Sequence, residues 1–172
     1  MVEIAIRPAT HNDVDILSVV GAGTFLESFA DTLPGPDIAL HCQNEHSAEA
    51  YAKILRSGAR AWLACIANTG AVIGYALNTA PNIPIARTSG DIELKRIYLL
   101  SKYQGVGAGR ALMKAAIKDA SERRAERLIL GVYCNNGNAM GFYRAMGFRT
   151  IGTRRFTVGT GTYEDLVFAL EL

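Results

Sequence analysis

Three glycines between an apolar segment and an amphipathic one form the pattern in this chain with the clearest chemistry. After the apolar segment 94–100 come, in order, Gln104, Gly105, Val106, Gly107, Ala108, Gly109 and Arg110. Glycine lacks the Cβ atom that would keep a ligand away from the backbone, and the start of a helix offers unpaired N–H groups with a partial positive charge. The pattern therefore predicts a site for a phosphate or diphosphate; a purely structural glycine turn is the alternative.

Two familiar phosphate-binding loops do not fit this segment. The dinucleotide fingerprint needs a third glycine where Arg110 stands, and an acidic residue after the next strand, where the chain has Tyr133, Cys134 and Asn135. The nucleoside-triphosphate loop needs a Gly-Lys-Ser/Thr ending, which the sequence lacks. The predicted ligand is therefore a nucleotide-like molecule of another class.

A second segment indicates which class. Residues 136–148 read Asn-Gly-Asn-Ala-Met-Gly-Phe-Tyr-Arg-Ala-Met-Gly-Phe. Together with Gln-Gly-Val-Gly-Ala-Gly at 104–109, this segment resembles the two hallmark segments of the GNAT superfamily of acyl-CoA-dependent N-acetyltransferases, in the right order. The resemblance covers about residues 91–148. Segments 24–29, 93–98 and 156–159, with Asp165, look closest to the polyamine-acetylating branch of that superfamily.

The resemblance implies acetyl-CoA as the co-substrate and points to the residues that bind it. Main-chain amides from Gln104 through Arg110 would hold the diphosphate, although Arg110 can equally be a solvated surface residue. The backbone of Leu99 would bond the pantetheine arm and would be a candidate donor to the developing oxyanion. Asn136 would bond the pantetheine or diphosphate region, and it can also cap the helix that follows.

The same resemblance implies two catalytic residues. Tyr143 would protonate the sulfur of coenzyme A, because the pKa of a phenol, about 10, lies close to that of an alkyl thiol; a core tyrosine is the alternative. Glu93 would be the general base, directly or through a water. Charged residues on a strand are usually its solvated side, and that alternative applies to Glu93 and to Asp91.

Other polar residues fit the chemistry less specifically. A polyamine acceptor would require carboxylates around it, and the candidates are Glu27, Asp31, Glu93 and Asp165. The histidines at 11, 41 and 46 have no companions at ligand spacing, so we expect neither a metal site nor a catalytic histidine. Cys134 lies near the expected thioester path without a paired histidine, so core packing is the better interpretation.

Composition indicates one globular domain spanning residues 1–172. Hydrophobic residues make up 49% of the chain and charged residues 20%, which is ordinary for a soluble protein. A net charge of +2 gives no reason to expect a nucleic-acid partner, and no segment has the length of a membrane span. Three scattered cysteines suggest neither a disulfide framework nor a zinc site, and they favour a cytoplasmic location.

The expected fold class is α/β (α+β), the GNAT fold: a mixed, mostly antiparallel central sheet of about six to seven strands flanked by helices. Hydrophobic periodicity predicts strands at 1–7, 61–67, 71–80, 91–99, 127–134, 149–156 and 163–170. It predicts helices at 47–55, after the glycine loop, at 138–146, and from about residue 12, where Gly21 to Gly23 should weaken the helix. Pro34, Gly35 and Pro36 are expected to break any helix, and loops are expected at 81–84 and 87–90.

The strand at 91–99 carries an informative irregularity. Its apolar positions begin at 92 and 94 and then shift phase to 97 and 99, which is what a β-bulge would produce. A bulge would turn backbone groups away from the neighbouring strand and free them for a ligand. In the GNAT family this strand and the next splay apart, and the pantetheine arm lies between them.

The function predicted from the sequence is transfer of an acetyl group from acetyl-CoA to a primary amine of a small molecule, by direct attack in a ternary complex. A polyamine is the first acceptor to consider. The alternatives are a protein or peptide N-acetyltransferase and a non-catalytic acyl-CoA-binding sensor. A homodimer is compatible with the sequence.

Overall fold

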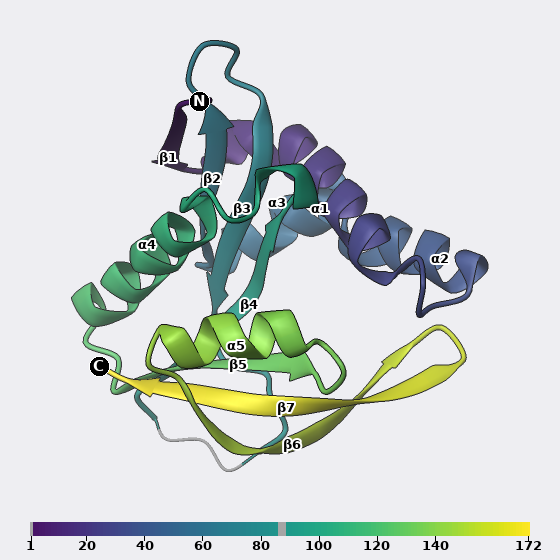
Figure 1. Ribbon diagram of the computed structural model, residues 1–172, viewed down its shortest axis with the longest axis vertical. Helices are drawn as coiled ribbons and strands as arrows, with labels where there is room; N and C mark the ends of the chain where they lie inside the picture. The colour runs from purple at the N-terminus through teal and green to yellow at the C-terminus, as the bar shows by residue number, and fades with distance from the viewer. Residues whose placement is uncertain (1, 86–88) are drawn as a thin grey trace.

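A computed structural model describes residues 2–85 and 89–172. Met1, where the first strand was expected to begin, and the expected loop residues Arg87 and Thr88 lie outside this part of the chain. The elements, drawn in Figure 1, are β1 (Ile4–Pro8), the 3-10 helix η1 (His11–Asp13), α1 (Val14–Phe29), α2 (Gly35–Glu45), α3 (Ala48–Arg56), β2 (Arg60–Ile66), β3 (Val72–Thr79), β4 (Asp91–Leu99), the 3-10 helix η2 (Ser101–Tyr103), α4 (Ala108–Glu122), β5 (Arg127–Tyr133), α5 (Gly137–Ala145), β6 (Arg149–Val158) and β7 (Gly161–Glu171).

The described strands form one seven-stranded sheet in the order β1-β2-β3-β4-β5-β7-β6. Every neighbouring pair is antiparallel except β4 and β5, which run parallel. A parallel pair needs a crossover, and α4 supplies it. The expectation of a mixed, mostly antiparallel sheet is confirmed.

Within the described chain, the sheet opens between β4 and β5, its only parallel pair of strands. β4 and β5 pair only from Asp91 to Glu93, opposite 127–129, although both strands continue for several residues beyond. Figure 1 shows the two strands diverging after this short ladder. The sheet thus contains a gap along which β4 and β5 do not pair with each other in the described chain, as the family resemblance implied.

The predicted bulge in β4 is present. In the ladder with β3, Leu77 faces Arg96 while its neighbour Asn78 faces Leu94, so Lys95 is the extra residue. The apolar side chains on either side of the bulge, at 92, 94, 97 and 99, consequently share one face of the sheet, where they join a single hydrophobic cluster. The bulge keeps the strand amphipathic despite the slip in its period.

Helices cover both faces of the sheet. α4 and α5 lie on one face, where Leu112, Met113 and Tyr143 pack in the same cluster as the inward residues of β4, β5 and β7. α1 and α3 lie on the opposite face, where Leu17 and Tyr51 pack against β2 and β3. We call these the α4 face and the α1 face. α2 extends the α1 face toward the β6–β7 hairpin, where Thr160 donates hydrogen bonds to Asp37.

Two expectations for the N-terminal third were wrong. α1 runs unbroken through Gly21, where a Cβ would overlap the hydroxyl of Tyr51 on α3. The Pro34–Pro36 segment starts α2 instead of excluding a helix. Proline is tolerated in the first helical turn, where its missing N–H costs nothing. Among the described residues, no helix has the length and apolar character needed to cross a membrane.

Candidate active site

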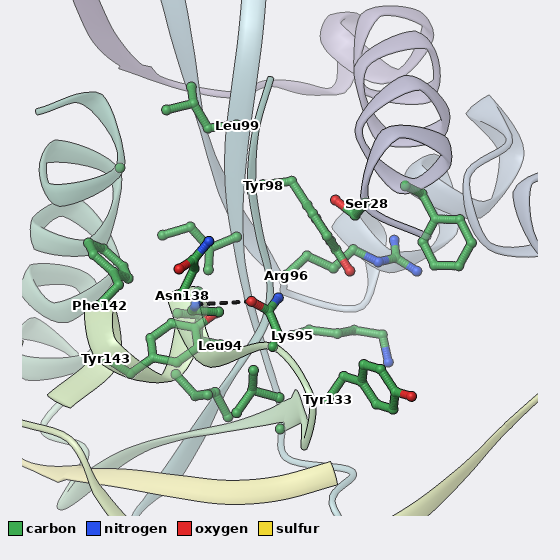
Figure 2. Close-up of a pocket in the computed structure, with 18 of the residues that line it drawn as sticks. Ser28, Leu94, Lys95, Arg96, Tyr98, Leu99, Tyr133, Asn138, Phe142 and Tyr143 are labelled. Atoms are coloured by element: carbon green, nitrogen blue, oxygen red, sulfur yellow. Dashed lines mark hydrogen bonds between the residues drawn. The ribbon is translucent and has the colours of Figure 1, made fainter. Parts of the chain in front are cut away.

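A cavity of about 790 Å³ passes through the sheet where β4 and β5 separate. Its lining comes from α1, α2, β4, the glycine loop, α4, β5, α5, β6 and β7. Figure 2 shows Phe142 and Tyr143 on one side of β4, and Lys95, Arg96 and Tyr133 on the other. The cavity therefore has an α4 side and an α1 side, which meet at the gap in the sheet.

The glycine loop forms the α4 end of the cavity. Gly105 and Gly107 have φ angles of +78° and +91°, a backbone conformation that side chains with a Cβ rarely adopt. A Cβ on either residue would point into open space. Gly107 is the N-cap of α4 and no side chain caps this helix end in the described structure. The first N–H groups of α4 are therefore available to an anion.

The loop residues predicted to bind a diphosphate divide into two groups. Gln104, Gly105, Gly107, Gly109 and Arg110 line the cavity, whereas Val106 and Ala108 do not. The side chain of Val106 is exposed and that of Ala108 is buried, so these two could contribute only through their backbone. Arg110 has no ion-pair partner within the described residues, and it lines the cavity from the first turn of α4.

The backbone of Leu99 faces the gap. Leu100 N–H donates to Ile73 O at 2.9 Å, across the β3 side of β4. Because successive residues of an antiparallel strand direct their hydrogen-bonding groups to opposite edges, the N–H and C=O of Leu99 point toward β5. The carbonyl of Leu99 accepts a hydrogen bond from Gln104 Nε2 at 3.2 Å. The loop and the open edge of β4 are thus connected directly.

Asn136 and Tyr143 lie on the α5 wall of the cavity. Asn136 Oδ1 accepts a hydrogen bond from Ala139 N–H at 3.0 Å, so the predicted capping role of Asn136 is confirmed. The ring of Tyr143 packs against Phe148 and Phe168, and its hydroxyl has no hydrogen-bond partner in the described chain. The phenol is therefore held by packing alone and is free to donate into the cavity.

Burial changes the acid chemistry expected of Tyr143. Desolvation, followed by the nearby Tyr98, raises the pKa of Tyr143 well above its ordinary value. The buried phenol is therefore a weaker acid than the free side chain, whose pKa of about 10 suggested a close match with a thiol. The hydroxyl stays protonated throughout the physiological range and is a permanent hydrogen-bond donor.

Glu93 is buried on the α1 side of the cavity, which corrects the alternative that it is a solvated strand residue. Its Oε2 accepts a hydrogen bond from the backbone N–H of Asn82 at 2.6 Å. This bond holds the carboxylate beside the point where β4 and β5 separate. Asp91, two residues earlier, is also buried, and it forms an ion pair with Arg127 at 2.8 Å.

An ion pair unforeseen from the sequence lies beyond the gap. Arg154 Nε donates to Asp165 Oδ2 at 2.9 Å, while Asp165 Oδ1 is buried without a partner among the described residues. Burial raises the pKa of Asp165, and the hydrogen bond from Arg154 opposes this shift. The guanidinium crosses Gly131 of β5, where a Cβ would lie 2.6 Å from it. Gly131 therefore provides the space that Arg154 occupies.

The remaining charges on the α1 side come from β4 and α2. Arg96 donates to Glu45 at 3.0 Å and lies over the ring of Tyr51. His46 contacts the hydroxyl of Tyr51 at 2.8 Å. Burial, and then the positive charge of Arg96, lowers the pKa of His46 to about 3, so this imidazole is neutral.

Sequence reasoning placed some carboxylates at the site that do not reach it. Glu27 accepts hydrogen bonds from the backbone and side chain of Ser101, and neither Glu27 nor Asp31 lines the cavity. Cys134 also lies outside the lining. The described residues contain no cluster of side chains that could hold a metal ion.

The chain matches the acetyltransferase (GNAT) family over residues 25–148. It is 34% identical over 160 residues to an uncharacterized N-acetyltransferase of Mycobacterium tuberculosis, covering 93% of this chain and 98% of that protein. It is 27% identical over 170 residues to an L-amino acid N-acetyltransferase of Escherichia coli, covering 98% and 97% of the two chains.

A polyamine enzyme is also among the relatives, over a shorter region. The spermine/spermidine N(1)-acetyltransferase of Bacillus subtilis is 29% identical over 89 residues, which cover 51% of this chain and 59% of that protein. In fold, the chain is similar to the PaiA N-acetyltransferase of Thermoplasma acidophilum in complex with coenzyme A. The TM-score is 0.79 with 20% identity, covering 99% of both chains.

Proposed function

The chain belongs to the acetyltransferase (GNAT) family and is an N-acetyltransferase; on this premise we propose that it transfers the acetyl group of acetyl-CoA to the primary amine of a small molecule, directly within a ternary complex. The observation that carries the proposal is the cavity that crosses the sheet. Its α4 side offers anion-binding backbone and its α1 side offers buried carboxylates. Donor and acceptor can therefore approach each other from opposite faces.

The donor side fits coenzyme A by its chemistry. The N-terminus of α4 with Gly105 and Gly107 suits the diphosphate, because an anion there meets N–H groups and no Cβ atoms. The backbone N–H and C=O of Leu99 face the gap, where they can hydrogen-bond an amide-bearing arm that lies along β4 like an added strand. Asn136 lines the same path from the opposite wall.

The reaction requires an amine nitrogen without its proton and a proton for the departing sulfur. Acetyl-CoA supplies the thioester carbon: a C–N bond forms, the C–S bond breaks, and the sulfur leaves as a thiol. The position of Glu93 on the α1 side supports it as the group that takes the amine proton, directly or through a water. Tyr143 lines the cavity on the α4 side with its hydroxyl unpaired among the described residues, which supports it as the donor of a proton to the sulfur.

An acceptor panel tests the proposal. The purified protein is mixed with acetyl-CoA and with polyamines, amino acids and a peptide with a free N-terminus, and thiol release is followed. Release with a small amine supports the proposal, and release with the peptide alone would assign the chain to peptide acetylation. Coenzyme binding by calorimetry without release for any amine would instead select a sensor module.

A further inference from the structure

We infer that the amine acceptor also carries a carboxylate, which Lys95 and Arg96 bind on the α1 side of the cavity. This inference rests on the proposed function and narrows its substrate class. The prediction from the sequence alone put polyamines first, and the charges around the acceptor side give the reason to depart from it.

The β4 bulge is what places two consecutive cations on one face. In a regular strand, neighbouring side chains point to opposite faces. Because Lys95 is the extra residue of the bulge, both Lys95 and Arg96 line the cavity. Figure 2 shows both side chains leaving β4 away from Phe142 and Tyr143, with Lys95 extending toward Tyr133.

The two cations differ in how far they are neutralised. Arg96 is buried and forms an ion pair with Glu45, whose side chain is 49% exposed. Lys95 is half-buried and has no carboxylate partner in the described part of the chain. The other cation of the acceptor side, Arg154, is paired with Asp165. Lys95 is therefore the positive charge that a ligand anion can neutralise.

Two imidazoles, His41 and His46, lie beside these cations in the cavity lining. Burial lowers the pKa of His41; among the neighbouring charges Glu45 has the largest effect and raises it, while Arg96 and Lys95 lower it. Arg96 acts on His46 in the same direction. The observation that favours an anion here is therefore the position of Lys95, which lines the cavity without a carboxylate partner among the described residues.

Carboxylate oxygens on the same side can receive the amine. Glu93 lies two residues before Lys95, so that their Cα atoms are about 7 Å apart along an extended strand. Asp165 Oδ1 is buried without a partner among the described residues. A compact molecule that bears both charges can direct its amine at these oxygens and its carboxylate at Lys95. A free amino acid has this arrangement, whereas its amide, a decarboxylated amine and spermidine do not.

Matched acceptors test the inference. For each common L-amino acid, kcat/KM is compared among the free acid, its amide and its decarboxylated amine, with spermidine alongside. We expect at least one acid to exceed its amide and its amine by tenfold or more. Equal or better use of the uncharged analogues or of spermidine would overturn the inference while leaving the proposed function intact.

Three variants locate the effect. Lys95→Met should bring the ratio of kcat/KM for the acid to kcat/KM for the amide close to one. Lys114→Met, a change of an exposed lysine on α4, should preserve this ratio. Glu45→Gln should increase affinity for the acid severalfold, because it leaves the charge of Arg96 unneutralised. A ratio unchanged in Lys95→Met would overturn the assignment.

A binding measurement separates the two hypotheses when turnover is absent. The protein saturated with coenzyme A is titrated with acid and amide by calorimetry. Tenfold tighter binding of an acid, lost in Lys95→Met, supports the inference even if no thiol is released, in which case the proposed function fails alone. No preferential binding of any acid overturns the inference.

Discussion

The guanidinium of Arg154 lies across the backbone of Gly131, and a Cβ on Gly131 would stand 2.6 Å from it. β5 and β6 are not neighbours in the sheet, since β7 lies between them. The arginine therefore spans two strands and holds Asp165 of the middle one at 2.9 Å. Gly131 on β5 thus leaves room for the ion pair between Arg154 on β6 and Asp165 on β7.

This relationship predicts a selective defect for Gly131→Ala. The new Cβ would displace the flexible end of Arg154 and weaken its bond to Asp165, so KM for the amine should rise severalfold while affinity for coenzyme A stays the same. Steady-state kinetics and calorimetry measure the two quantities. Gly152→Ala is the matched control, because its Cβ would meet open space on β6. Equal effects of both changes would contradict the account.

Tyr143→Phe should lower kcat by about 10²-fold or more, the scale of general acid catalysis, with little change in affinity for coenzyme A. The hydroxyl has no partner among the described residues, and the ring is held by Phe148 and Phe168. Removing the oxygen should therefore leave the fold intact. Single-turnover kinetics with calorimetry measures the effect, and an unchanged kcat would exclude the acid role.

Because His46 is buried in its neutral form, we predict that the free energy of unfolding falls in mild acid. The pKa of His46 is lowered to about 3, mainly by burial, while an unfolded chain binds the proton near pH 6.5. Between these values only the unfolded state is protonated, so the stabilising contribution is complete above about pH 6.5. It is lost as pH falls toward 3, at up to about 1.4 kcal/mol per pH unit.

Urea unfolding at pH 7.5 and pH 5 measures this dependence. His46→Gln should unfold with a weaker pH dependence than the wild type, since the amide does not titrate. His11→Gln, a change of an exposed histidine, should retain the wild-type dependence. An identical dependence in all three proteins would show that the buried imidazole is not responsible.

Local patterns predicted the donor side of the site from the sequence. The phase slip of β4 revealed the bulge, and the helix expected at 138–146 is present as α5, which ends before Gly147, whose φ is +94°. These features depend on residues a few positions apart. Their physical causes, a period of two and a left-handed backbone angle, can be read from a short stretch of chain.

The acceptor side could not be predicted in the same way, because it is assembled by long-range packing. The sequence pattern does not predict α2, because proline is expected to break a helix, although Pro36 lies in the first turn, where it is tolerated. Without a predicted α2, the sequence gives no reason to locate His41 and Glu45 at the site. Arg154 likewise became recognisable only when β6, β7 and Gly131 were brought together.

The central claim is that the start of α4 holds the diphosphate of coenzyme A, and calorimetric titration with coenzyme A and with pantetheine, which lacks the diphosphate, tests it most directly. Two substitutions are compared: Gly107→Ala, and Gly58→Ala as its control. Both glycines have nearly the same φ, +91° and +92°, and open space where the Cβ would go, so both variants should suffer a similar backbone strain of about 1–2 kcal/mol.

We predict that the wild type and Gly58→Ala bind coenzyme A at least tenfold more tightly than pantetheine, and that Gly107→Ala loses this preference. Pantetheine bound as tightly as coenzyme A by the wild type, or a preference retained in Gly107→Ala, would contradict the claim.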